Sequence, residues 1–206
     1  MLRSHIDHLA ITAPSLSAGV EYVRGKLGVA PGPGGEHPAM GTHNFLLKLG
    51  ATMYLEVIAP NPAAPKPGRA RWFGLDHVEK PRLATWVART NDVRAAAAAS
   101  PVALGNAEPM SRGKLNWLIT IAADGSLPLE GIAPTLIEWQ SDPHPASTLP
   151  ESGCVLVRLE AFHPQAQTIR ALLRSIGFEG AFSLSAAGQA RLVAHIQTPS
   201  GIQRLS

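Results

Sequence analysis

The sequence predicts an α+β protein in which one order of elements, β-α-β-β-β, occurs twice and is followed by a shorter β-α-β-β segment. Short apolar runs rich in β-branched residues indicate strands, and apolar residues three and four positions apart indicate helices. The segment 60–70 carries four prolines, which is typical of an extended linker, and the order of elements restarts after it. With 206 residues, 45% of them hydrophobic, the chain is long enough for its segments to pack as one compact unit.

The first segment, residues 1–60, begins with a strand and continues with a helix. Ser15 or Ser17 is placed to cap this helix, and Gly28 is placed to end it. The two strands on either side of Gly50 are expected to pair as a hairpin. Strands of this segment are expected at 5–12, within 34–40, at 43–49 and at 52–59.

The second segment, residues 70–145, repeats this order with a helix that begins near Asp92 and contains an alanine run. Its strands are expected at 82–90, 114–122 and 134–139. The third segment, residues 152–206, is expected to be shorter by one strand and so to form a partial βαββ module. Its expected elements are a strand at 154–162, a helix at 164–176, a strand at 191–197 and a short final strand.

Composition excludes several classes of protein. Charged residues make up 16% of the chain, the net charge is +3, and the 18 lysines and arginines are scattered, so a nucleic-acid partner is not expected. The single cysteine, Cys154, excludes an internal disulfide and a multi-thiolate zinc site. No run approaches the roughly 18 apolar residues of a membrane span, and the first residues lack the pattern of a secretion signal. We therefore expect a cytoplasmic protein whose partner is a small molecule.

Three polar residues interrupt apolar strand patterns: His8, Glu56 and Glu138. A buried imidazole or carboxylate costs free energy unless it is paired or bound to a cation. If the three side chains converge, they form a site for a divalent metal with oxygen and nitrogen ligands. Aligned without gaps, the two segments place Glu138 on Glu56 and Thr85 on His8.

Each of these residues also has a simpler interpretation. His8 could be a core histidine bonded to Asp7 or His5, and Glu56 could face solvent from an edge strand. Two arginines in predicted loops, Arg71 and Arg112, could each hold a carboxylate.

Three stretches of the chain resemble the glyoxalase-like domain family of the vicinal oxygen chelate superfamily. The opening from His5 to Ile11 resembles the first strand of that family. The stretch from Gly41 to Gly50, followed by Tyr54 to Pro60, resembles its central hairpin, and Leu136 to Trp139 resembles the end of its second half. The resemblance implies tandem βαβββ modules that curve a mixed sheet into a cup, and it leaves a homodimer open as an assembly.

The resemblance also implies that His8, Glu56 and Glu138 would be metal ligands at the first and fourth strands. Thr85, at the remaining position, is a poor ligand for such an ion. A divalent Fe, Mn, Ni, Co or Zn would suit these groups, with Glu56 or Glu138 as the catalytic base. The implied function is an isomerase, lyase or dioxygenase acting on a small molecule with neighbouring oxygens. The alternative is a metal-free binding or sequestration protein of the bleomycin-resistance type.

Three further residues are predicted substrate contacts. His43 shares a strand face with Phe45 and Leu47, so it is expected to reach the cup. His37 lies in a loop that could cover the cup mouth, and Trp117 could line an apolar pocket, although core packing is the default for a tryptophan.

Overall fold

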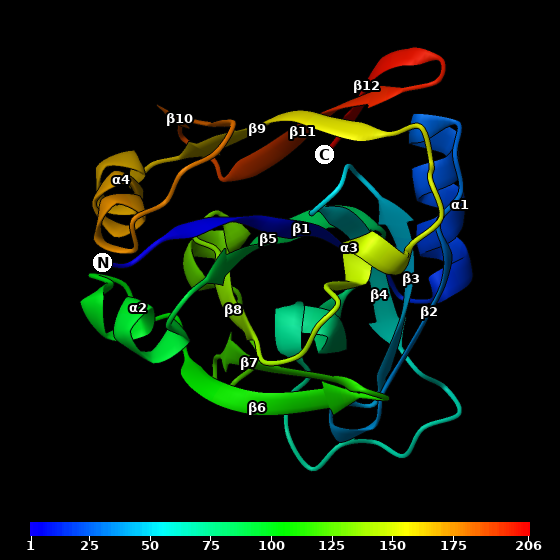
Figure 1. The fold of residues 1–206 in the computed structure, drawn as a ribbon, viewed down its shortest axis with the longest axis horizontal. Helices are drawn as coiled ribbons and strands as arrows, with labels where there is room; N and C mark the ends of the chain where they lie inside the picture. Colours follow the sequence, from blue (N-terminus) through cyan, green and yellow to red (C-terminus); the bar gives the residue numbers. More distant parts are fainter.

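The computed structural model describes residues 1–206 and confirms an α+β fold with a curled mixed sheet (Figure 1). The main sheet has eight strands in the order β2-β3-β4-β1-β5-β8-β7-β6. These strands are β1 (Ser4–Thr12), β2 (Gly32–His37), β3 (Thr42–Lys48), β4 (Tyr54–Pro60), β5 (Arg82–Thr90), β6 (Asn106–Arg112), β7 (Leu115–Ile121) and β8 (Thr135–Trp139).

The main sheet consists of two similar halves that meet at its centre. In the first half β1 pairs parallel with β4, and in the second half β5 pairs parallel with β8. The two first strands, β1 and β5, pair antiparallel with each other and join the halves. The sheet curls until its outer strands, β2 and β6, approach each other. Gly35 of β2 lies against the Arg112 side chain at the end of β6. This curl encloses a cup.

Helices cover the outer side of the main sheet and have the caps that their sequences indicate. Helix α1 (Leu16–Leu27) begins at Ser15, whose side chain accepts a hydrogen bond from the Ala18 N–H, and ends at Gly28 with φ 71°. Helix α2 (Val93–Ala99) begins at Asp92, which accepts from the Ala95 N–H at 2.9 Å.

The third segment forms a separate four-stranded sheet in the order β10-β9-β11-β12. Its elements are β9 (Val155–His163), α4 (Ala166–Ser175), β10 (Phe182–Ala186), β11 (Arg191–Thr198) and β12 (Gly201–Leu205). Strand β10 was not expected from the sequence; it is a five-residue, half-exposed edge strand whose Phe182 and Leu184 pack against the core. Its parallel pairing with β9 also gives this sheet a strand order unlike that of either half.

The two faces of the main sheet have different partners. Leu9, Ile11, Leu55 and Val57 point outward and share one apolar core with the third sheet and α4. Inward-facing residues form a second apolar cluster around Trp72, Phe73 and Trp117. The third segment therefore supports the main sheet from outside, and the cup interior comes from the first two segments.

Short helical turns complete the chain. They are η1 (Pro38–Met40), η2 (Trp72–His77), η3 (Pro128–Gly131) and α3 (Pro145–Thr148). No helix combines the length and hydropathy needed to traverse a lipid bilayer.

Candidate functional site

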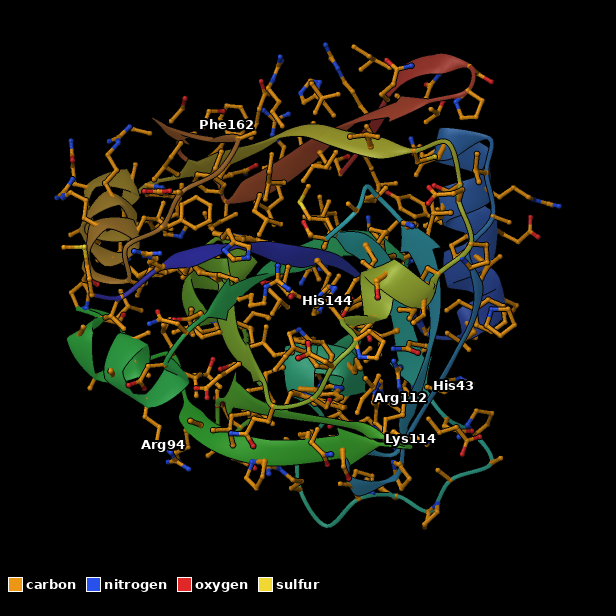
Figure 2. The ribbon with its side chains drawn as sticks, viewed as in Figure 1. His43, Arg94, Arg112, Lys114, His144 and Phe162 are labelled. Atoms are coloured by element: carbon orange, nitrogen blue, oxygen red, sulfur yellow. The ribbon has the colours of Figure 1, made fainter.

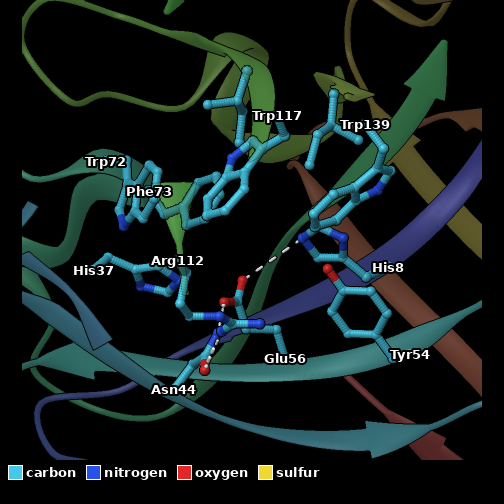
Figure 3. A pocket seen from close by; sticks show the side chains of 12 residues that line it. His8, His37, Asn44, Tyr54, Glu56, Trp72, Phe73, Arg112, Trp117 and Trp139 are labelled. Carbon is cyan, nitrogen blue, oxygen red and sulfur yellow. Dashed lines mark hydrogen bonds and ion pairs between the residues drawn. The ribbon is translucent and has the colours of Figure 1, made fainter. Parts of the chain in front are cut away.

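A pocket of about 370 Å³, including its mouth, lies inside the cup (Figure 3). Its lining divides into a polar side from the first half and an apolar side from the second, with Arg112 as the exception. The polar side comprises His8, His37, Asn44, Tyr54, Glu56 and Arg112. The apolar side comprises Trp72, Phe73, Trp117, Ile119, Ile137 and Trp139.

An irregularity in β1 places His8 at the pocket floor and the polar residue before it directly behind. Ile6 pairs with Ala88 and His8 pairs with Val87, so Asp7 is an extra residue in β1, as in a β-bulge. A bulge turns neighbouring side chains toward one face, and Asp7 Oδ1 lies 2.7 Å from His8 Nδ1. Because the ionised carboxylate can only accept, His8 Nδ1 carries a proton, and in the neutral form of the ring Nε2 is then an acceptor.

Asp7 is the centre of a buried network. Its Oδ2 accepts hydrogen bonds from Trp139 Nε1 at 3.0 Å and His144 Nε2 at 2.9 Å. Burial raises the pKa of Asp7, but hydrogen bonds from His144 and His8 outweigh it and hold that pKa well below its ordinary value. The fully buried Asp7 is therefore a fixed negative charge behind His8.

Glu56 faces His8 across the pocket floor. Its Oε2 lies 3.7 Å from His8 Nε2, too far for a hydrogen bond, and its Oε1 accepts from Asn44 Nδ2 at 2.5 Å. Tyr54 stacks on the His8 ring with centroids 4.5 Å apart. Burial, followed by the charges of Asp7 and Glu56, raises the pKa of Tyr54 well above its ordinary value, so Tyr54 stays a neutral phenol.

Arg112 brings a positive charge to the pocket from the end of the β6–β7 hairpin (Figure 2). Its Nη1 donates to Asn44 Oδ1 at 2.9 Å, and none of its nitrogens lies within ion-pair distance of a carboxylate. His37 lines the polar side of the pocket as well, and its Nδ1 lies 3.1 Å from Thr42 Oγ1. Burial lowers the pKa of His37 to about 4, so this ring is neutral near pH 7.

Aromatic rings make the opposite wall. Trp117 and Trp139 are 5.4 Å apart between centroids, and Trp72 and Phe73 stack at 5.6 Å. Such a wall favours a flat apolar group over a hydrated one.

Glu138 does not join His8 and Glu56, which corrects the expected convergence of three ligands. Its neighbours Ile137 and Trp139 line the pocket, so alternation turns Glu138 to the outer face of β8. There its Oε2 accepts from the Val93 N–H at the start of α2. Thr85, at the fourth expected position, donates to the Gly131 carbonyl at 3.1 Å and adds no ligand either.

The predicted substrate contacts have mixed placements. His37 and Trp117 line the pocket, whereas His43 does not (Figure 2). The facing assigned to β3 was inverted, because Asn44 points inward and His43 pairs opposite Glu36 on the other face. His8 also makes the hydrogen bond to Asp7 that its simpler interpretation predicts. Tyr54, Asn44 and Trp139 were missed; the alternation that marks Glu56 would have found Tyr54, two residues earlier.

These residues do not fit a complete metal site. One imidazole and one carboxylate face each other, and no group of three or more His, Cys, Asp or Glu side chains has metal-binding geometry. Catalytic and structural metal sites usually have at least three protein ligands. The positions in the second half that would supply the remaining metal ligands hold aromatic, aliphatic or hydroxyl side chains.

The curled sheet of two similar halves around an inner pocket defines a protein of the vicinal oxygen chelate class. Within that class, the chain belongs to the glyoxalase-like domain family, whose model matches residues 6–177.

A solved structure shares this architecture at low sequence identity, and two others superpose with lower scores. A hypothetical protein from Staphylococcus aureus superposes with a TM-score of 0.64 at 14% identity, over 93% of this chain and 88% of that one. An Mn(II)-bound glyoxalase from Novosphingobium aromaticivorans gives 0.47 at 9% identity, over 96% and 79%. Methylmalonyl-CoA epimerase from Mycobacterium tuberculosis gives 0.42 at 17% identity, over 67% and 88%. No curated protein matches the sequence.

Proposed function

We propose that the cup binds a small molecule with a flat apolar body and two adjacent hydroxyl groups, and that binding requires no divalent ion. The observation that carries this proposal is the aromatic wall of Trp117 and Trp139, which stands where the second half would have to supply ligands. This is the binding or sequestration class that the sequence left open.

The polar floor supports the choice of adjacent hydroxyl groups. Glu56 Oε2 and, in the neutral tautomer with its proton on Nδ1, His8 Nε2 are two acceptors 3.7 Å apart. Two neighbouring O–H groups can donate one hydrogen bond to each acceptor, while the ring that carries them lies against the tryptophans. Arg112 retains N–H groups beyond the one given to Asn44, and these can bind a further oxygen of the ligand.

Binding of methylcatechol in the presence of EDTA tests the proposal. Quenching of tryptophan fluorescence reports binding, since three of the four tryptophans line the pocket. We expect Glu56→Gln to weaken binding about ten-fold or more, because hydrogen bonds to a charged group contribute roughly 1.5–3 kcal/mol.

Glu138→Gln is the matched control, since Glu138 lies on the outer face of the same sheet. We expect it to leave the dissociation constant unchanged. Absence of methylcatechol binding with EDTA, or equal effects of the two substitutions, would refute the proposal.

A metal-dependent enzyme is the second candidate, and the hydrogen bond between Asp7 and His8 favours it. Metal-binding histidines usually donate their other ring nitrogen to a carboxylate, as His8 does. This candidate needs ligands beyond His8 and Glu56. Calorimetric titration with Mn²⁺ and Zn²⁺ separates the two candidates: stoichiometric binding that His8→Ala abolishes, together with ligand binding only in the loaded protein, would replace the first proposal with the second.

A further inference from the structure

A second pocket of about 240 Å³, including its mouth, lies behind the apolar wall of the first. The two pockets share Trp72 and Phe73, which line both. Beyond these rings the second pocket is bounded by Leu104, Ile121 and Leu127, with a few hydroxyl groups. The shared rings therefore form a partition between the proposed binding site and an additional, partly apolar space.

Phe73 is held in this partition by an unusual backbone conformation. Its φ is 58°, in the left-handed region that L residues other than Asn and Asp seldom adopt. Gly74 follows with φ 65°, and its N–H donates to the Gly125 carbonyl at 2.8 Å. The disfavoured conformation thus persists because neighbouring contacts fix it, and it directs a large ring to the boundary of both pockets.

We propose that Phe73 is the residue that limits ligand length. A ligand whose ring rests against the tryptophans can extend an apolar chain only as far as Phe73, beyond which the second pocket is closed to it. This inference rests on the proposed function, because it concerns ligands of the same site. It identifies the accepted class as compact rings with short apolar substituents.

The test uses catechols with a straight alkyl chain para to one hydroxyl group, from methyl to heptyl. For the native protein, each added methylene should tighten binding about four-fold until the chain meets the partition, after which affinity should stop rising or fall. For Phe73→Gly this limit should move to longer chains by at least two methylenes. Dissociation constants come from tryptophan fluorescence, with circular dichroism to verify folding.

Glu130→Gly is the matched control. Glu130 also has a positive φ, 56°, but its side chain is 74% exposed and lines neither of the two pockets. Glu130→Gly relieves the same kind of backbone strain without opening the partition, so the ligand-length limit of this variant should equal that of the native protein. Phe73→Leu is the second variant, in case Phe73→Gly does not fold, and it should move the limit by a smaller step.

The outcomes separate the two proposals. An unchanged limit in both Phe73 variants, with normal binding of methylcatechol, overturns the partition and leaves the binding function intact. The same shift in Glu130→Gly also overturns the partition. No binding of any catechol to the native protein overturns both.

Discussion

Replacing Asp7 with asparagine tests the buried network beneath the pocket. The carboxylate accepts from His8 at 2.7 Å, from His144 at 2.9 Å and from Trp139 at 3.0 Å, and it is fully buried. Asparagine keeps one acceptor oxygen but presents an NH₂ group where the second oxygen accepted. Because hydrogen bonds to a buried charge contribute roughly 1.5–3 kcal/mol each, we expect Asp7→Asn to lower the free energy of unfolding by about 3 kcal/mol at pH 7.

The loss should depend on pH in a defined direction. The folded-state pKa of Asp7 is depressed, so its stabilisation is fully present above its ordinary pKa of 3.8 and is lost as pH falls through that value toward the folded-state pKa. The stability difference between native and variant protein should therefore be constant above about pH 5 and shrink below about pH 4.

Urea unfolding followed by tryptophan fluorescence measures both effects. Asp76→Asn is the control, because Asp76 pairs with Arg71 near the surface and its replacement should cost less than about 1 kcal/mol. A loss below about 1 kcal/mol for Asp7→Asn at pH 7, or a difference that persists undiminished at pH 3, would refute the assignment of Asp7 as a buried, ionised acceptor.

Three further substitutions test other parts of the structure. Burial lowers the pKa of His37 to about 4, so the native protein should lose stability as pH falls from 6.5 to 4, because the unfolded state binds a proton more readily. Urea unfolding should show that His37→Gln loses about 2.5 kcal/mol less free energy of unfolding by pH 4.5 than the native protein does. Glu138→Gln should lower the midpoint of thermal unfolding slightly, because it weakens the acceptor at Val93; an unchanged midpoint would contradict that role. Gly131→Ala should cost more than about 3 kcal/mol or prevent folding, since the new Cβ would lie 1.9 Å from the Ala84 carbonyl oxygen; wild-type expression and unfolding midpoint would contradict this.

Sequence periodicity was sufficient for most of the fold, because strands and helices leave local patterns. The capped helix from Ser15 to Gly28 and the hairpin about Gly50 follow from such patterns and were confirmed. Strand β10 was missed although Phe182, Leu184 and Ala186 alternate with serines, because it is only five residues long and half-exposed. Strand β6, Asn106–Arg112, was missed because its residues are mostly polar and no apolar alternation marks it.

The site was less predictable because alternation identifies two faces without saying which is inside. Glu56 lines the pocket, as expected, but Glu138 and His43 face the other way by a shift of one residue. The bulge at Asp7 depends on pairing with β5, which no local pattern records. Arg112 reaches the pocket only because the sheet curls far enough to bring β6 beside β2.

The central pairing of β1 with β5 has an evolutionary consequence. When two equivalent subunits form a site about a two-fold axis, every substitution on one wall is duplicated on the other. Here both walls belong to one polypeptide, so each can mutate on its own. The two walls can therefore differ in chemistry: one carries a histidine and a glutamate, and the other carries aromatic side chains.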